Sequence, residues 1–164
     1  MKRLVILGIG LVLAVGCNPG NDTIGADAPN FKVESLSRPG VDVSIASFKG
    51  KVILLDYWAT WCGPCRQFMP YVQALHRKYA DKGLEVMAIS NEDRKLVQSF
   101  RNKTPEFSFP IYLDEFNLAQ SAFQVDSFPT AILISKSGKV LSFERGVSTD
   151  SPKQLEALIQ KELG

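Results

Sequence analysis

Apolar residues along this chain recur with two periods, one typical of strands and one typical of helices. A continuous apolar run over 52–58, interrupted only by Asp56, predicts a strand that is covered on both faces, as in the centre of a sheet. Apolar and polar residues alternate over 31–36 and again over 41–45, which predicts the two half-exposed strands of a hairpin. The pattern therefore places a β-hairpin before a buried central strand.

Helical spacing begins shortly after the central strand. Apolar residues recur three and four positions apart over 62–80, which predicts a long amphipathic helix. Pro70 falls inside this helix and should kink it, because proline lacks a backbone donor and its ring crowds the preceding turn. Gly83 is typical of the residue that follows a helix end. We therefore expect one long helix directly after the central strand.

The rest of the chain continues the alternation of strands and helices. Further strands are predicted at 84–89, 109–113, 130–134 and 140–143, and further helices at 91–102 (capped by Asn91), at 116–123 and from 151 onward. This alternation favours a mainly parallel sheet with right-handed crossovers, to which the last two strands add an antiparallel edge. We therefore expect an α/β fold with a central mixed sheet flanked by helices.

The first residues carry the features of an export signal. Lys2 and Arg3 precede an apolar run over 4–15, which is shorter than the roughly 20 residues of a membrane-spanning helix. The run leads to Cys17 and resembles the lipobox of bacterial lipoproteins, although Ala14 stands where the commonest lipobox has leucine. The resemblance implies cleavage before Cys17 and lipidation of its sulfur. An ordinary signal peptide with a chance cysteine and an uncleaved anchor are the alternatives.

The expected division of the chain follows from this start. We predict a lipoprotein signal peptide over 1–16, a flexible tether over 17–28 that is rich in Gly, Asn and Asp, and one folded domain over 29–164. Several acyl chains would anchor the protein without a spanning helix. We therefore expect an extracytoplasmic protein that is lipid-anchored to a bacterial membrane and faces the periplasm.

Charge gives no indication of a nucleic-acid partner. Lys2 and Arg3 of the expected signal account for the whole formal net charge of +2 at pH 7. The remaining chain is near neutral and carries no basic stripe, so we expect no nucleic-acid binding. Its composition is ordinary for a globular domain.

Two of the three cysteines stand together where the central strand gives way to the long helix. At the helix N-terminus, unpaired N–H groups and the positive end of the dipole favour a thiolate at Cys62. Cys65, one turn further on, can attack whatever Cys62 captures. A bridge between them closes so small a loop that stability is a poor reason for it. Zinc would need four ligands, and the single histidine, His76, is expected on the solvated helix face.

The residues around these cysteines resemble a known family. The segment 52–66 reads V-I-L-L-D-Y-W-A-T-W-C-G-P-C-R and resembles the active-site segment of thioredoxin, while F-P-T at 128–130 resembles the second thioredoxin signature. The predicted hairpin and an extra helix and strand over 92–113 are similar to the TlpA/ResA-type branch of membrane-anchored thiol-disulfide oxidoreductases. The resemblance implies a thioredoxin-like fold with an N-terminal β-hairpin and an inserted helix and strand.

Members of that branch typically reduce disulfides of exported proteins, apocytochrome c among them. A membrane thiol transporter then reduces the branch member itself, so that it can act again. The resemblance implies the same activity and partners here, and we expect a monomer with no cofactor or metal beyond the Cys62–Cys65 disulfide. The chain departs from several members at Phe68, where they carry a glutamate. It has Asp56 at the place of thioredoxin's buried acid, but the lysine that pairs with that acid corresponds to Ala88.

Each residue of the motif has an expected role. Cys62, partly exposed, attacks a substrate disulfide, and the more buried Cys65 attacks Cys62 to release the reduced substrate. Gly63 and Pro64 fill the turn between them and resemble the pair found in reducing rather than oxidising members. Asp56 lies in an apolar strand, so its pKa should be raised and it could exchange protons with Cys65; a structural role at a nearby turn is the alternative.

Three residues are expected to receive the substrate. Pro129 should be cis, as in the family, and the backbone at Phe128 would pair with the substrate chain like an added strand. Trp61 would form an exposed apolar rim against which the substrate packs, whereas Trp58 is assigned to the core. Substrate would therefore dock where the cysteine motif meets the Pro129 loop.

Two other functions match the residues less well. A peroxiredoxin-like thiol peroxidase needs a Pro-x-x-x-Thr-x-x-Cys arrangement, whereas Thr60 stands two residues before Cys62 and position 57 is tyrosine. A non-catalytic metallochaperone of this fold has more widely spaced cysteines and a histidine near Pro129. A disulfide reductase is therefore the preferred hypothesis.

Overall fold

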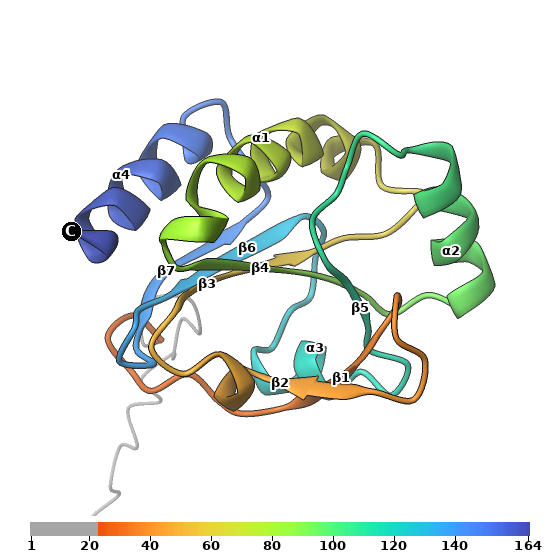
Figure 1. Cartoon of the computed structure of the whole chain (residues 1–164), viewed down its shortest axis with the longest axis horizontal. Coiled ribbons are helices and arrows are strands. Elements are labelled where there is room, and N and C mark those ends of the chain that lie inside the picture. The colour runs from red at the N-terminus through yellow and green to blue at the C-terminus, as the bar shows by residue number, and fades with distance from the viewer. Residues whose placement is uncertain (1–22) are drawn as a thin grey trace, which may run out of the picture.

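Residues 23–164, described in a computed structural model, form a seven-stranded mixed sheet flanked by helices (Figure 1). The strands are β1 Lys32–Ser35, β2 Asp42–Ser44, β3 Val52–Tyr57, β4 Leu84–Ser90, β5 Ile111–Leu113, β6 Thr130–Ile134 and β7 Val140–Arg145. The helices are α1 Gly63–Tyr79, α2 Arg94–Lys103, α3 Leu118–Ala122 and α4 Ser151–Leu163. In space the strands follow the order β2-β1-β5-β4-β3-β6-β7. The predicted fold class is confirmed, including the hairpin and the inserted α2 and β5.

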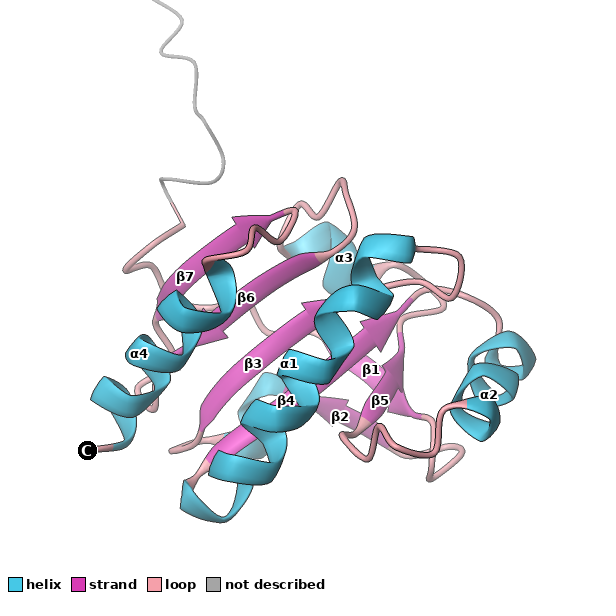
Figure 2. Ribbon diagram, turned by 90° about the horizontal axis from the view of Figure 1, so that it is seen from above, coloured by secondary structure: helices cyan, strands magenta, loops and turns pink. Residues whose placement is uncertain are grey.

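The central strand β3 divides the hydrophobic core between the two faces of the sheet. All six of its residues are buried, Asp56 included, as the apolar run around Asp56 predicts. Leu54 packs in a cluster with Val72 of α1 and Leu155 of α4, and Figure 2 shows these two helices lying across the same face of the sheet. Leu55 points the other way and packs in a cluster with Ala119 of α3. Both faces of β3 are therefore covered.

The bounds of the long helix match the prediction to within one residue at each end. α1 continues through Pro70, where the missing N–H leaves only the Arg66 carbonyl without its usual helical donor. The short 3₁₀ helix η2 Ala80–Lys82 follows it and is closed by Gly83, whose φ of 107° is a left-handed conformation suited to glycine. The core-facing residues of α1 therefore extend from the cysteine motif to the far end of the helix.

Strand directions confirm the parallel centre of the sheet and the antiparallel edge predicted for the last two strands. The strands β3, β4 and β5 are parallel, but β6 is antiparallel to β3 as well as to β7. The reason is that residues 123–129 bring the chain to the C-terminal end of β3, where Thr130 pairs with Tyr57. The parallel core is therefore limited to three strands, with antiparallel strands on both sides.

The start of the inserted helix also differs from the prediction. The N-cap of α2 is Asp93, whose Oδ1 accepts a hydrogen bond from Lys95 N at 2.8 Å. Asn91, the predicted cap, uses its side-chain amide to donate to the Asn117 and Gln120 side chains. Asn91 therefore connects this loop to α3 rather than starting α2.

The folded part of the chain begins earlier than predicted. Gly25 N donates to Val140 O at 2.8 Å, and Val140 N donates to Ala26 O at 3.0 Å. Residues 25–28 are therefore attached to the start of β7, an edge strand with free backbone groups, so a flexible tether over 17–28 is wrong for them. The expected signal peptide and Cys17 lie outside the described residues. Within 23–164 none of the helices has the length and apolar character needed to cross a membrane.

Candidate functional site

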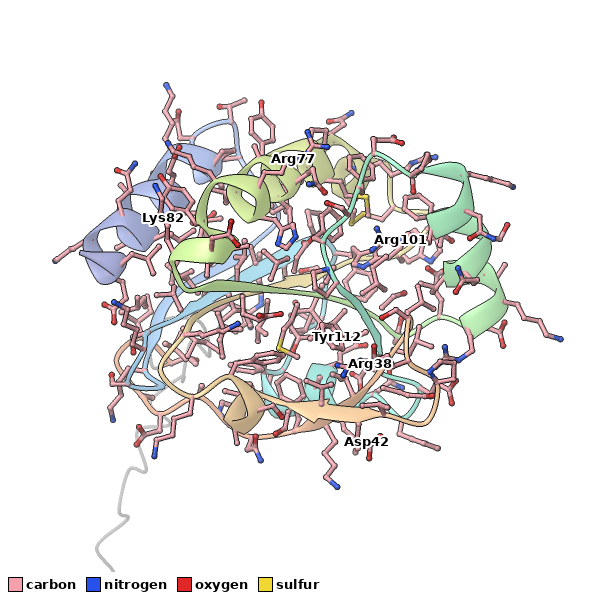
Figure 3. The ribbon with its side chains drawn as sticks, viewed as in Figure 1. Arg38, Asp42, Arg77, Lys82, Arg101 and Tyr112 are labelled. Carbon is pink, nitrogen blue, oxygen red and sulfur yellow. A yellow bond between two sulfur atoms is a disulfide. The ribbon has the colours of Figure 1, made fainter. Side chains whose placement is uncertain are left out.

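The cysteine pair lies at the junction of β3 and α1. Cys62 is the N-cap of α1 and forms a disulfide with Cys65, with their Cα atoms 5.3 Å apart. Figure 3 shows this disulfide at the start of the helix. Cys65 N donates to Cys62 Sγ at 3.2 Å. The helix N-terminus therefore already directs an amide at the Cys62 sulfur, which is the geometry that stabilises a thiolate after reduction.

Cys62 is less accessible than predicted, whereas Cys65 is buried as expected. Cys62 is 3% exposed and Cys65 is 2% exposed, so the expectation of a partly exposed Cys62 is wrong for the disulfide form. Both cysteines belong to the same core cluster as Met69, and Phe128 packs against that cluster. Pro64, by contrast, is exposed. The solvent-facing surface of the motif is therefore formed by Pro64 rather than by the two sulfurs.

An exposed apolar surface adjoins the motif. Trp61 is 70% exposed, and its ring centroid lies 6.1 Å from that of the half-buried Phe128. The Phe128–Pro129 peptide bond is cis, as the family resemblance implied, and Pro129 is buried. Trp58 is fully buried, as predicted. Trp61 and Phe128 together, hereafter the apolar rim, therefore connect the cysteine loop with the cis-proline loop.

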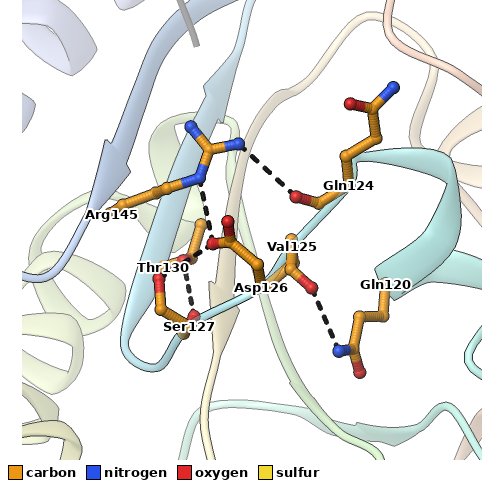
Figure 4. A network of polar contacts seen from close by, with 7 residues as sticks. All are labelled: Gln120, Gln124, Val125, Asp126, Ser127, Thr130 and Arg145. Carbon is orange, nitrogen blue, oxygen red and sulfur yellow. Dashed lines mark hydrogen bonds and ion pairs between the residues drawn. The ribbon is translucent and has the colours of Figure 1, made fainter. Parts of the chain in front are cut away.

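Polar contacts hold the cis-proline loop on β6 and β7 (Figure 4). Thr130 Oγ1 donates to Ser127 O at 2.7 Å. The Arg145 guanidinium pairs with Asp126 at 3.2 Å. Directly after β7, Gly146 N donates to Pro129 O at 2.8 Å. Bonds on both sides of the cis peptide therefore fix the loop.

These contacts should differ in their effect on stability. We expect Thr130→Val to lower the free energy of unfolding by about 1–2 kcal/mol, because Thr130 is fully buried and its loss leaves the Ser127 carbonyl without that donor. Arg145→Met should cost at most about 1 kcal/mol, because the Asp126 side chain is 71% exposed and the pair is screened by solvent. Urea unfolding of both variants measures the difference. Equal losses would contradict this ranking.

Asp56 lies on the side of the sheet that carries the disulfide. Its strand neighbours are Ala88 on β4 and Ala131 on β6, and both belong to the core cluster that contains Cys65. Asp56 is 1% exposed, and its Oδ1 has no hydrogen-bond partner among the described residues. Desolvation raises the pKa of this carboxyl to about 7. Opposite Asp56, the adjacent strand β4 carries Ala88, which has no charged group to pair with the carboxyl.

One contact near the cysteines was not indicated by the sequence. The Glu92 carboxylate, in the loop between β4 and α2, accepts hydrogen bonds from Thr60 N at 2.5 Å and from Thr60 Oγ1 at 2.8 Å. Thr60 precedes Trp61 in the cysteine loop. Thirty-two positions separate the two residues in the chain, so no local pattern relates them.

The sequence suggested that His76 lies on the solvated face of α1, and the structure shows that this prediction is wrong. It is half-buried, and desolvation is the main reason why its pKa is lowered. Its Nδ1 has no hydrogen-bond partner within the part of the chain that the structure describes. Residues 23–164 contain no group of three or more His, Cys, Asp or Glu side chains that could hold a metal ion.

The sequence matches the Redoxin family over residues 23–159. It is 35% identical to a thiol-disulfide oxidoreductase ResA of Bacillus cereus over 138 residues, which cover 84% of this chain and 78% of the relative. It is 30% identical to the ResA of Bacillus subtilis over 162 residues, which cover 92% of this chain and 89% of the relative.

Solved structures agree with these relatives. A crystal structure from Chlorobium tepidum, described as thiol:disulfide interchange protein DsbE, has a TM-score of 0.78 and 31% identity, covering 86% of this chain and 98% of the other. A solution structure from Bacteroides thetaiotaomicron, described as a protein disulfide isomerase, has a TM-score of 0.77 and 26% identity, covering 85% and 89% of the two chains.

Proposed function

The chain belongs to the redoxin family and is a thiol-disulfide oxidoreductase of the TlpA/ResA type, and from this premise we propose that it reduces disulfides of exported proteins. The observation that carries the proposal is the Cys62–Cys65 pair at the N-terminus of α1, with a helix amide on the Cys62 sulfur and a cis-proline loop beside it. Apocytochrome c is the proposed client, because the TlpA/ResA-type branch acts on it.

The proposed reaction is two exchanges of sulfur partners. The Cys62 thiolate attacks one sulfur of the substrate disulfide, which forms a mixed disulfide and releases one substrate thiolate to be protonated. The Cys65 sulfur then attacks Cys62, which closes the Cys62–Cys65 bridge and releases the second substrate thiol. The protein dithiol is oxidised by two electrons and the substrate disulfide is reduced by two. No cofactor beyond this disulfide is proposed.

Asp56 is the proposed proton acceptor for the second exchange. Cys65 must lose its thiol proton before its sulfur can attack, and Asp56 shares its side of the sheet. A carboxyl with a pKa of about 7 can take up and release a proton near neutral pH. The apolar rim and the backbone at Phe128 are the proposed docking edge for the substrate chain.

The proposed location is outside the cytoplasm, on a bacterial membrane. The export signal over 1–16 and the lipobox-like Cys17 support a lipid anchor that faces the periplasm. A membrane thiol transporter is the proposed electron donor, because the bridge must be reduced again after every turnover. Gly63 and Pro64 between the cysteines favour the reducing direction.

A trapping experiment tests the proposed clients. Cys65→Ser in the full-length chain, expressed in its own host, should accumulate mixed disulfides on Cys62, because the second exchange cannot occur. The adducts should dissolve on reduction and contain exported proteins with paired cysteines, apocytochrome c among them. The matched control is the Cys62→Ser/Cys65→Ser double variant, which should trap nothing. Adducts made only of cytoplasmic proteins would contradict the proposal.

Two assays separate the proposal from the other functions. A reductase accelerates insulin reduction by dithiothreitol, whereas a metallochaperone does not. A thiol peroxidase consumes peroxide at the rate at which its thiols are oxidised, whereas the reductase should consume it no faster than a free dithiol. Both assays use the full-length protein in detergent.

A further inference from the structure

The Glu92 carboxylate accepts hydrogen bonds from the cysteine loop rather than from the start of α2, the helix that follows it. Thr60 N donates to Oε2 at 2.5 Å and Thr60 Oγ1 donates to Oε1 at 2.8 Å, so both oxygens are engaged by one residue. Hydrogen bonds to a charged acceptor are shorter and stronger than bonds between neutral groups. Ser90 Oγ also donates to Oε2 at 3.4 Å. The carboxylate is therefore fixed between the end of β4 and the cysteine loop.

The neighbouring carboxylate has a different task. Asp93 caps α2 through the Lys95 amide, and Glu92 makes no contribution to that cap. Two adjacent acidic residues thus divide two functions between them. Helix α2 has the cap it needs from Asp93, so the start of this helix does not explain the position of the Glu92 side chain.

The loop that Glu92 holds has few other attachments. Cys62 N donates to Ala59 O at 3.1 Å, which closes the loop into a turn. Within residues 23–164, the side-chain hydrogen bonds to residues 59–61 are those of Glu92. Trp61 follows Thr60 directly and is 70% exposed, so burial does little to fix its ring. The Thr60–Glu92 contact therefore supplies the side-chain hydrogen bonds that hold the residue leading into Trp61, between the buried Ala59 and Cys62.

We infer that Glu92 is a positioning residue that sets the specificity for protein substrates. By holding Thr60, it keeps Trp61 beside Phe128 and so preserves the apolar rim before a substrate arrives. A protein disulfide docks on the rim and gains from a surface that is already ordered, because ordering a side chain at an interface weakens binding. A small disulfide makes little use of the rim and depends on Glu92 much less. The inference rests on the proposed docking role of the rim.

The test compares two substrates in steady-state kinetics with the full-length protein in detergent. We expect Glu92→Ala to raise the KM for insulin about three- to tenfold with kcat changed less than about twofold. For oxidised glutathione, the change in KM should be less than about twofold. Asp93→Ala is the matched control, since it removes an adjacent carboxylate and a helix cap but no contact with Thr60. It should leave both KM values as in the wild type.

Two further variants separate positioning from charge and from loss of stability. Glu92→Gln should keep the KM for insulin close to the wild-type value, unlike Glu92→Ala. The glutamine carbonyl can accept from Thr60 N, and its amide can donate to Thr60 Oγ1. Glu92→Asp, which keeps the charge on a shorter side chain, should not. Thr60→Val combined with Glu92→Ala should raise the insulin KM less than the product of the two single effects.

The possible results lead to different conclusions. If Trp61→Ala raises the insulin KM while Glu92→Ala behaves like Asp93→Ala, Glu92 has no positioning role. A fall in kcat at unchanged KM would likewise overturn the inference, because it would place Glu92 in the exchange step. If the wild-type protein reduces oxidised glutathione but not insulin, the proposed protein substrates fail, and the docking role of the rim fails with them.

Discussion

Replacing Cys62 with serine is expected to lower kcat/KM for insulin reduction at least about 10³-fold. Exchange requires a thiolate, and a serine hydroxyl is not appreciably ionised near neutral pH. The Cys65 amide that now donates to Cys62 Sγ at 3.2 Å would face a neutral hydroxyl with no nucleophilic function. The residual rate should equal that of dithiothreitol alone.

Cys65→Ser is the matched variant, and it should fail differently. Its Cys62 still attacks, so it should form one mixed disulfide per protein molecule and then stop. The comparison is decisive because exposure does not rank the two sulfurs, which are 3% and 2% exposed. The order of attack is assigned from the position of Cys62 at the helix N-terminus. Turnover in Cys62→Ser that clearly exceeds the background would reverse that assignment.

Local sequence patterns predict the elements that carry the site. The bounds predicted for β6 are those observed, β3 ends one residue earlier than predicted, and α1 differs from prediction by one residue at each end. Their patterns are clear because burial on both faces gives β3 a nearly continuous apolar run, and burial on one face gives α1 a helical period. The cis peptide at Pro129 is different, since only the family resemblance implied it.

Features that depend on distant partners were not predictable. Residues 25–28 pair with β7 through backbone groups, so their Gly- and Asp-containing sequence indicated a tether. The Glu92–Thr60 contact joins two loops that no pattern relates. In each case the deciding interaction lies outside the local window.

Asp56→Asn is expected to stabilise the oxidised protein, increasingly so as the pH rises. Burial raises the pKa of Asp56 from 3.8 to about 7, so between these values the unfolded carboxyl is ionised while the folded one keeps its proton. The unfolded state then binds fewer protons, and stability falls as the pH rises. The gap corresponds to about 4 kcal/mol at 1.36 kcal/mol per pKa unit. Asparagine avoids this loss, so the variant should match the wild type near pH 4 and exceed it by about 4 kcal/mol at pH 8.

The same substitution should impair turnover. If Asp56 accepts the Cys65 proton, Asp56→Asn should slow insulin reduction by up to about 10²-fold, and the pH dependence near 7 should disappear. A purely structural aspartate would change stability and leave the rate and pH profile as in the wild type. Gain of stability together with loss of rate is therefore the expected signature of a proton-transfer group placed in the core.

Asp114 is the control for Asp56, because it is a buried aspartate whose carboxylate is hydrogen-bonded. It is buried like Asp56, at 2% exposed, but its two oxygens accept hydrogen bonds from Ala119 N and Gln120 N at the start of α3. Asp114→Asn replaces one acceptor with a donor that faces an amide, so it should lower the free energy of unfolding by about 1–3 kcal/mol. The two buried aspartates should thus respond with opposite signs at pH 8, measured by urea unfolding. If Asp56→Asn is also destabilising there, the Asp56 carboxylate has a partner in the folded protein, and its role as a desolvated proton acceptor is wrong.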